Sequence, residues 1–304
     1  MPTEPRAIRI GTRGSALARW QAERVKARLR AMKPDLECTL KVFTTAGDLS
    51  LDRPLPEIGG KGLFTEELER ALLAGGIDLA VHSLKDLPVD NPPGLILGAL
   101  PERGDARDAL VSARYSTLKE LPKGGRVGTS SLRRGAQLLS IRPDLVLLSL
   151  RGNVDTRIRK AMEGGFEAIV LAAAGLLRLG HGSAISSYLS FEEMLPAPGQ
   201  GALAVQCRKD DEGTLALLAA IDDRATRRSV SAERCFLGSL GGGCSAPIAA
   251  LGRVDGAMIE LEGLVASRDG TQIVRVRGAG SDPGELGARL AGEALSKGAR
   301  ELLA

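Results

Sequence analysis

Short apolar runs alternate with amphipathic stretches along the first two-thirds of the chain, and this alternation restricts the fold more than any other feature. Each run of strand length is followed by a stretch with the 3.6-residue periodicity of a helix. In the first hundred residues, strands are predicted at 7–11, 36–43 and 77–81, with helices at about 15–32 and 65–74. Such an order is typical of α/β proteins with a largely parallel sheet.

The same pattern starts again near residue 126. Strands are predicted at 126–128, 145–150 and 168–172, with helices near 131–141 and 154–163. Both halves also open alike, because Ile10-Gly11-Thr12 and Val127-Gly128-Thr129 each lead through serines into an arginine-bearing helix. We therefore expect two similar lobes.

The turns after these two openings are candidate anion sites. At Ser15 and Ser130 a strand has just ended at glycine and a helix begins, which presents unpaired N–H groups and the positive end of the helix dipole. The alternative is that these serines only cap their helices, which is their more common use.

The pattern changes after about residue 224, where a small α+β domain is predicted. It contains a helix at 227–240, a glycine loop at 241–243, strands near 247–252, 258–265 and 272–276, and a helix from about 284 to 303. Proline-containing segments at 92–101 and 196–199 are predicted crossings that form a hinged cleft. The predicted domains are 1–101 with 200–220 as lobe 1, 102–199 as lobe 2, and 221–304 as the C-terminal domain.

Composition excludes several classes of protein. With 43% hydrophobic and 26% charged residues, the chain is typical of a globular protein. Residues 1–10 hold no apolar signal segment, and no stretch approaches the roughly 18 apolar residues of a membrane span. We expect a cytoplasmic protein, or one processed from a longer precursor, with no membrane partner. Four cysteines without a C-x-x-C pair and two histidines predict neither zinc nor any other metal, and no disulfide framework.

Cys244 differs in context from the other three cysteines. Three glycines, 241–243, precede it and are expected to expose its thiol on a loop. Exposure of this kind suits covalent attachment or nucleophilic chemistry. Cys38, Cys207 and Cys235 are expected to be buried and inert.

Lys85 and Asp86 follow directly on a predicted apolar strand. Ligands of open α/β sheets bind at the carboxyl ends of the strands, so Asp86 is a candidate general acid/base or cation stabiliser. The alternative is a solvated surface loop. Because the chain has only two histidines, carboxylates are the expected proton carriers.

Arginine supplies 31 of the 41 basic residues, and lysine supplies 10. A GC-rich coding sequence explains part of this excess, but not why arginines stand beside predicted strand and helix ends. Those arginines are Arg13, Arg19, Arg133, Arg134, Arg151, Arg157 and Arg178. Guanidinium groups bind carboxylates or phosphates through two hydrogen bonds. For Arg157 and Arg178 above all, solvation of a helix face is the alternative.

The glycine-rich segment 59–64 lacks the first glycine of a phosphate-binding P-loop and has Gly62 where serine or threonine should hold magnesium. Nucleotide binding is therefore rejected for this segment. A mobile lid over a cleft and a plain surface turn are both left open.

Taken together, seven segments closely resemble the porphobilinogen deaminase family and occur in that family's order. They are residues 11–15, 59–64, 82–88, 128–134, 151–157, 195–201 and the Cys244 loop. The resemblance implies two lobes folded like periplasmic binding proteins, with mixed but mainly parallel sheets, and a small C-terminal α+β domain. It also implies a monomeric transferase of haem, chlorophyll or corrin biosynthesis. Four porphobilinogens would be joined with loss of ammonia, and hydrolysis would release hydroxymethylbilane.

The resemblance further implies roles for individual residues. Cys244 would hold a dipyrromethane cofactor through a thioether, and Asp86 would stabilise the azafulvene cation and exchange protons. The implied cofactor-binding residues are Lys85, Ser130, Arg133, Arg134 and Arg157. The implied substrate-binding residues are Arg13, Ser15, Arg19, Arg151 and Arg178. Gly241 and Gln206 stand where the family often has glutamate, and Gly135 follows the arginine pair, which affects only local packing.

Two other functions are weighed against this one. A bilobal solute-binding protein for a carboxylated ligand explains paired lobes and anion-binding turns, but not a cysteine loop in an added domain. A nucleic-acid binder fits the pI near 9.0. However, aromatic residues make up only 3% of the chain, so few side chains are available on which nucleic-acid bases could stack. We therefore expect no nucleic-acid partner.

Overall fold

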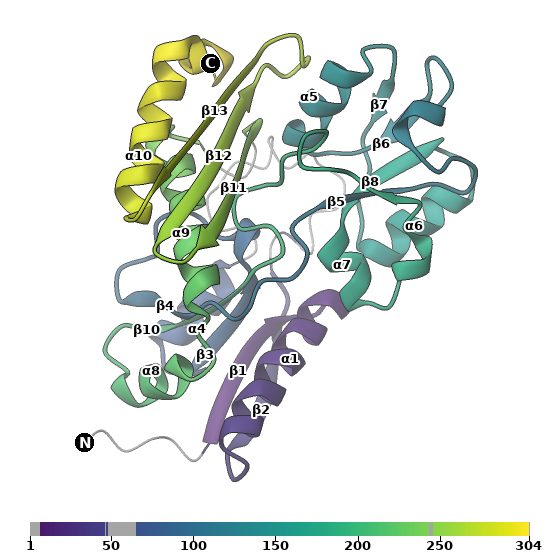
Figure 1. The fold of residues 1–304 in the computed structure, drawn as a ribbon. Coiled ribbons are helices and arrows are strands. Elements are labelled where there is room, and N and C mark those ends of the chain that lie inside the picture. Colours follow the sequence, from purple (N-terminus) through teal and green to yellow (C-terminus); the bar gives the residue numbers. More distant parts are fainter. Residues whose placement is uncertain (1–6, 46, 48–64, 243–245, 304) are drawn as a thin grey trace. The chain divides into compact units, whose positions relative to one another are not determined.

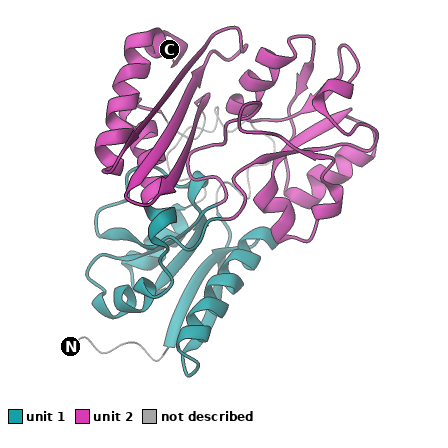
Figure 2. Cartoon of the chain, viewed as in Figure 1, with its two compact units in different colours: residues 1–103, 202–227 teal, residues 104–201, 228–304 magenta. Residues whose placement is uncertain are grey.

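The structure is a computed structural model that describes residues 7–45, 47, 65–242 and 246–303. The chain divides into two compact units (Figure 2). Unit 1 comprises residues 1–103 and 202–227, and unit 2 comprises residues 104–201 and 228–304. The chain therefore leaves unit 1 after residue 103, returns to it for residues 202–227, and then enters unit 2 again. The division into three domains stays a prediction.

Unit 1 is built on a five-stranded sheet of order β2-β1-β3-β10-β4 (Figure 1). Its strands are β1 (Ala7–Arg13), β2 (Glu37–Phe43), β3 (Leu79–Ser83), β4 (Leu95–Ala99) and β10 (Leu203–Arg208). β1 runs parallel to β2 and β3, whereas β10 runs antiparallel to β3 and β4. The strand that completes this sheet thus comes from the returning segment of the chain.

Helices cover both faces of this sheet, and its inner strands β3 and β10 are buried along almost their whole length. They are α1 (Ala16–Met32), α4 (Glu66–Leu73) and α8 (Glu212–Ala219). Leu79 and Val81 of β3 join the core cluster that includes residues of α1 and α8. The intervening Ala80 joins the cluster formed with Leu68 and Leu72 of α4. The two-residue alternation of β3 therefore fixes which helix covers which face.

Unit 2 contains a second five-stranded sheet, of order β7-β6-β8-β5-β9. Its strands are β5 (Asp108–Val111), β6 (Arg126–Gly128), β7 (Val146–Leu148), β8 (Ala168–Ala172) and β9 (Ser187–Tyr188). Its helices are α5 (Leu132–Ile141), α6 (Val154–Met162) and α7 (Ala173–Arg178). β6 runs parallel to β7 and β8, and β5 runs antiparallel to β8 and β9. Both sheets place one antiparallel strand at the same position, so the predicted pair of similar lobes is confirmed.

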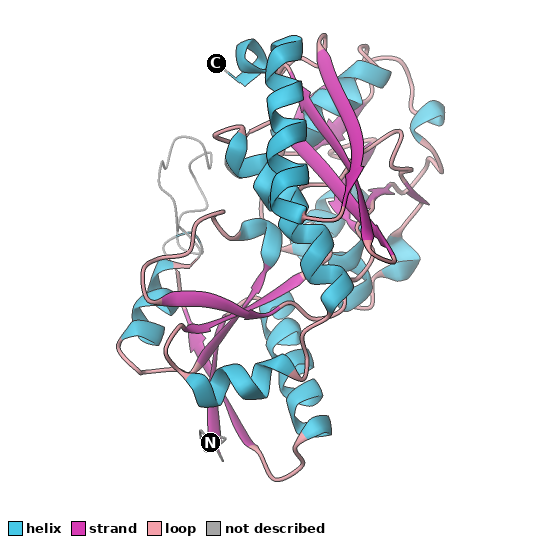
Figure 3. Cartoon of the chain, turned by 60° about the vertical axis from the view of Figure 1, so that its left-hand side comes forward, coloured by secondary structure: helices cyan, strands magenta, loops and turns pink. Residues whose placement is uncertain are grey.

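The C-terminal part of unit 2 carries an antiparallel sheet of β11 (Ile248–Asp255), β12 (Met258–Ala266) and β13 (Ile273–Gly280). Helix α9 (Arg224–Ser239) precedes the sheet, and α10 (Pro283–Ala294) lies along it (Figure 3). Gly263 of β12 allows the buried ring of Phe236 to pack on the sheet, since a Cβ there would lie 2.4 Å from its Cζ. The predicted α/β class with a small α+β part is confirmed.

The predicted final helix is wrong in one respect. α10 ends at Ala294, and a π-helical turn (Leu295–Ala299) separates it from α11 (Arg300–Leu303). Gly298 in this turn has a φ of 92°, which breaks the helical path. Within the described ranges, no helix is long and apolar enough to cross a membrane.

Candidate functional site

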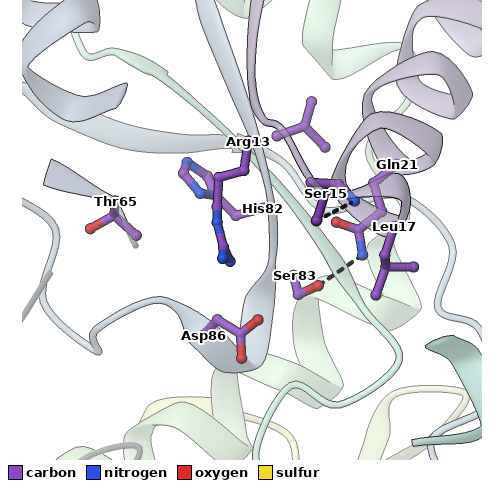
Figure 4. A pocket seen from close by; sticks show the side chains of 10 residues that line it. Arg13, Ser15, Leu17, Gln21, Thr65, His82, Ser83 and Asp86 are labelled. Carbon is purple, nitrogen blue, oxygen red and sulfur yellow. Dashed lines mark hydrogen bonds between the residues drawn. The ribbon is translucent and has the colours of Figure 1, made fainter. Parts of the chain in front are cut away.

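A polar pocket opens in unit 1 where β1 and β3 end (Figure 4). Parallel strands bring their carboxyl ends to the same edge of a sheet, which is where open α/β sheets bind ligands. Arg13 is the last residue of β1, and Asp86 ends the 3₁₀ turn (Leu84–Asp86) that follows β3. The polar residues that line the pocket are Arg13, Ser15, Gln21, Thr65, His82, Ser83 and Asp86.

The first turn of α1 forms one wall of this pocket. The hydroxyl of Ser15 caps the helix by accepting a hydrogen bond from the Ala18 amide at 3.3 Å. One turn further, the Gln21 amide donates to the Ser83 hydroxyl at 2.8 Å and so ties α1 to the end of β3. The pocket thus places a guanidinium and a carboxylate beside a helix N-terminus, a combination suited to a small zwitterionic or carboxylated ligand.

His82 is a buried imidazole in the pocket wall, with 6% of its surface exposed. Burial and the nearby Arg13 lower the pKa of His82 to about 4. The imidazole is therefore uncharged at neutral pH, and the exposed carboxylate of Asp86 is left as the acidic group of this pocket.

In unit 2, the turn between β6 and α5 is held by its own hydroxyl groups. The Ser130 hydroxyl accepts from the Leu150 amide and donates to the Leu150 carbonyl, each at 3.0 Å. The hydroxyl of Ser131 caps α5 by accepting from the Arg134 amide at 3.4 Å. Ser131 thus holds the cap, while Ser130 fixes the turn to the segment before Arg151.

Arg133 and Arg134 meet at the buried carboxylate of Asp108, which is 0% exposed. Arg133 Nη1 donates to Oδ2 at 2.8 Å, and Arg134 donates to Oδ1 through Nη2 at 2.7 Å and Nε at 3.0 Å. Gln200 donates to the same Oδ1 at 3.1 Å. The two guanidiniums hold the pKa of Asp108 well below its ordinary value. Two cations against one anion give this group a net positive charge.

The remaining predicted arginines lie on loops and helix ends. Arg157 Nε donates to the Gly152 carbonyl at 2.7 Å within the first turn of α6. Arg178 Nη2 donates to the Gly201 carbonyl at 2.6 Å, and burial lowers the pKa of Arg178 to about 10. At that pKa the guanidinium remains charged at neutral pH. Arg151 stands between β7 and α6.

The structure brings together some predicted residues and separates others. Arg13, Ser15 and Asp86 share one pocket, and Arg133 and Arg134 share one carboxylate. Arg19 is exposed on α1, and Lys85 precedes Asp86 in the 3₁₀ turn; neither lines the pocket. Cys244 and the glycine-rich segment 59–64 lie outside the described residues.

Sequence reasoning missed Gln21, His82 and Asp108 as site residues. A signal existed for Gln21, which occupies an apolar-face position of α1 between the buried Ala18 and Ala22. Asp108 stands at the start of an apolar run, where a charged residue requires a partner.

The three described cysteines depart in part from expectation. Cys207 is buried, and burial raises its pKa to about 11, as an inert thiol requires. Cys38 and Cys235 are only half-buried, so the prediction of burial is wrong for them. Cys38 lies on the edge strand β2. Cys235 lies on α9, where its thiol contacts the Gly284 carbonyl without being fully covered.

The chain matches known family models and protein sequences over nearly its whole length. The family model of the porphobilinogen deaminase dipyrromethane cofactor binding domain matches residues 8–216, and that of the porphobilinogen deaminase C-terminal domain matches residues 228–296. A porphobilinogen deaminase of Roseiflexus sp. (strain RS-1) is 52% identical over 97% of this chain and 98% of its own length. One of Brevibacillus brevis is 50% identical over 97% and 96%. Among solved structures, the methionine-binding protein MetQ is 15% identical, with a TM-score of 0.46 over 74% of this chain and 93% of that one.

Proposed function

Because this chain belongs to the porphobilinogen deaminase family, we propose which of its residues carry out that family's reaction. The enzyme is a transferase that joins four porphobilinogens head to tail with loss of ammonia, and hydrolysis then releases hydroxymethylbilane for tetrapyrrole biosynthesis. The observation that carries the assignment of residues is the pocket of unit 1, where Arg13, Ser15 and Asp86 meet.

The dipyrromethane cofactor of this family fits the charges found in unit 2. The group of Arg133, Arg134 and Asp108 has one positive charge in excess, and Arg133 Nε lacks a hydrogen-bond partner among the described side chains and backbone. A buried cation of this kind is stabilised by a carboxylate, which the cofactor carries. When bound, the dipyrromethane supplies the pyrrole carbon to which the first substrate ring is joined.

We assign the cofactor to Cys244 through a thioether, with Lys85, Ser130, Arg133, Arg134 and Arg157 binding its polar groups. The residues that flank the cysteine loop support this assignment. Gly241, with a φ of 68°, follows the end of α9, and the Gly242 amide donates to the Leu237 carbonyl at 3.1 Å. This bond fixes the residues that precede Cys244 in the sequence to the end of α9.

Asp86 is proposed as the group that moves protons. Loss of ammonia from porphobilinogen leaves a cation on the substrate, and a carboxylate beside it stabilises that charge and accepts the proton released on condensation. Asp86 is exposed at the mouth of a pocket and can be reached by a substrate.

Each porphobilinogen carries an acetate and a propionate, which must be paired as they leave water. We propose Arg13, Ser15, Arg19, Arg151 and Arg178 as the residues that bind them. Arg13 and Ser15 are supported by their place in the pocket, and Arg178 by its charge and burial. The enzyme is further proposed to be cytoplasmic and to act as a monomer. Light scattering would check the monomer by comparing the mass in solution with the chain mass of 31.8 kDa.

Intact mass spectrometry tests this function directly. The purified protein should carry an adduct of dipyrromethane mass, and adding porphobilinogen should raise the mass in steps of one pyrrole unit. Cys244→Ala should lack the adduct, whereas Cys235→Ala, a control at a half-buried cysteine outside the glycine loop, should retain it. A wild-type protein at its bare sequence mass, without turnover of porphobilinogen, would favour a bilobal solute-binding protein for a carboxylated ligand.

A further inference from the structure

A hydrogen bond between two side chains joins the start of α6 to the end of α7 in unit 2 (Figure 1). His181 Nε2 lies 2.7 Å from Asp155 Oδ1, and the imidazole donates because a carboxylate only accepts hydrogen bonds. Asp155 lies in the first turn of α6, and His181 follows the end of α7. The two residues are 26 positions apart, so the bond links two separate elements.

The backbone of His181 is firmly held. Helix α7 ends in a Schellman motif, in which Gly180 has a φ of 77° and its amide donates to the Leu177 carbonyl at 3.1 Å. The His181 amide completes the motif by donating to the Leu176 carbonyl at 2.8 Å, and the His181 carbonyl accepts from the Ala184 amide at 3.1 Å. His181 is therefore a fixed point beside the last turn of α7.

The start of α6 is held less firmly. Every residue from 151 to 160 is exposed or half-buried, and burial in this helix begins at Ala161. Val154 and Ile158 reach the hydrophobic cluster that α6 shares with α7, but both are only partly buried. A segment with few buried apolar contacts opens locally at a low cost in free energy. The bond to His181 thus gives this turn a second attachment to α7.

The same turn is flanked by two of the arginines that are proposed to bind ligands. Arg151 precedes α6, and Arg157 lies within it. The Arg157 amide donates to the Asn153 carbonyl at 3.1 Å, and its Nε donates to the Gly152 carbonyl at 2.7 Å. Because these bonds join the turn internally, a displacement of Asp155 moves Arg157 and the adjoining Arg151 with it.

We propose that Asp155 and His181 are positioning residues that hold the start of α6 against the end of α7 and so keep Arg151 and Arg157 in place. The proposal rests on the proposed function, which gives Arg151 to substrate binding and Arg157 to cofactor binding. A binding group that is already held in place loses less conformational freedom when its ligand arrives. Loosening this turn therefore weakens binding without removing a contact to the ligand.

Hydrogen exchange tests the attachment without reference to activity. The side chains of His181 and Asp155 are 35% and 52% exposed. Removing a pair of this exposure in His181→Ala holoenzyme should make the Thr156 and Arg157 amides exchange about two- to fivefold faster. His181→Gln should restore wild-type exchange, because the terminal amide of glutamine can donate to Asp155 in place of Nε2. Unchanged exchange in β5 shows that the fold of unit 2 is intact.

Steady-state kinetics at one fixed pH tests the consequence for binding. In His181→Ala, the KM for porphobilinogen should rise about two- to fivefold with kcat changed by less than about twofold, and His181→Gln should restore the KM. Asp155→Ala should also raise the KM, and adding His181→Ala to it should have no further effect, since both act through one bond. Glu163→Gln is the matched control: it breaks an exposed ion pair with Arg159 that lies wholly within α6, and it should leave the KM unchanged.

Each outcome decides the proposal. Unchanged exchange of the α6 amides in both His181→Ala and Asp155→Ala overturns it, and this measurement does not require turnover. Faster exchange with an unchanged KM, or independent effects of the two substitutions on the KM, also overturns it. Arg151→Ala separates the proposal from the proposed function: if it raises the KM while His181→Ala does not, positioning fails and the proposed function stands. If Arg151→Ala leaves the KM unchanged, the proposed role of Arg151 fails, and its positioning fails with it.

Discussion

Replacing Asp108 by asparagine should strongly destabilise unit 2. The substitution keeps the size of the side chain but removes the negative charge that pairs with both Arg133 and Arg134. All three side chains are buried, with exposed fractions of 0%, 4% and 8% for Asp108, Arg133 and Arg134. Removing one partner from a buried ion pair costs about 3–5 kcal/mol, because the remaining charge stays out of water. We expect a loss of this size in the free energy of unfolding of unit 2.

The pH dependence of this loss has a definite sign. The pKa of Asp108 in the folded protein lies below its ordinary value, so its carboxylate stabilises the fold fully above the unfolded pKa of about 3.9. That contribution is lost as the pH falls through the folded pKa. The penalty of Asp108→Asn should therefore be constant between about pH 5 and pH 8, well above both pKa values.

Hydrogen exchange of the amides in β5, β6 and β8 is the suitable assay, because a global probe would mix the two units. The measurement is best made in the Cys244→Ala background, where cofactor attachment does not contribute. Glu260→Gln breaks the exposed ion pair with Arg277, whose side chains are 50% and 65% exposed, and should cost less than about 1 kcal/mol. A loss below about 1 kcal/mol for Asp108→Asn would refute the reasoning.

Two further substitutions test other parts of the structure. Asp86→Asn should fold and retain the cofactor, but its kcat should fall about 10²- to 10⁴-fold because the proton-transfer step loses its carboxylate. The rate of ammonia release in a single turnover measures this loss, and a near-normal rate would remove Asp86 from the mechanism. Gly201→Ala should lower the free energy of unfolding by about 1–3 kcal/mol, since Gly201 has a φ of 84° and a Cβ would lie 2.7 Å from the Gly104 carbonyl oxygen. Chemical denaturation measures the loss, with Gly292→Ala as the control, because a Cβ at Gly292 meets nothing within 4 Å. Equal stability of the two variants would contradict the predicted strain at Gly201.

Local periodicity identified the elements that carry an amphipathic or continuous apolar signal. Helix α1 and strands β1 and β3 lie within a few residues of their predicted bounds. Strands β4, β5 and β9 were not predicted, because they are short and owe their strand form to partners far along the chain. β5, for example, pairs with β8, and Ala109 lies opposite Leu171.

In the candidate site, too, the features that depend on partners far along the chain could not be predicted. Arg13, Ser15 and Asp86 could be predicted because each stands where a strand ends or a helix begins, and parallel topology then brings those ends together. The partner of Arg133 and Arg134 could not be predicted, since Asp108 is 25 residues from Arg133 and other acidic residues lie nearer in sequence. The low pKa of His82 comes from its burial and from the nearby Arg13, and only the folded sheet produces both.

The place of β10 in the first sheet has a consequence for synthesis on the ribosome. β10 lies between β3 and β4, yet it is made about a hundred residues after β4. At roughly 5–20 residues per second, the nascent chain waits on the order of 5–20 s before these two strands obtain their shared neighbour. During that interval their backbone donors and acceptors are open to pairing with other chains. The first unit to emerge is thus completed late, and a fragment that stops before residue 203 lacks the strand that joins β3 to β4.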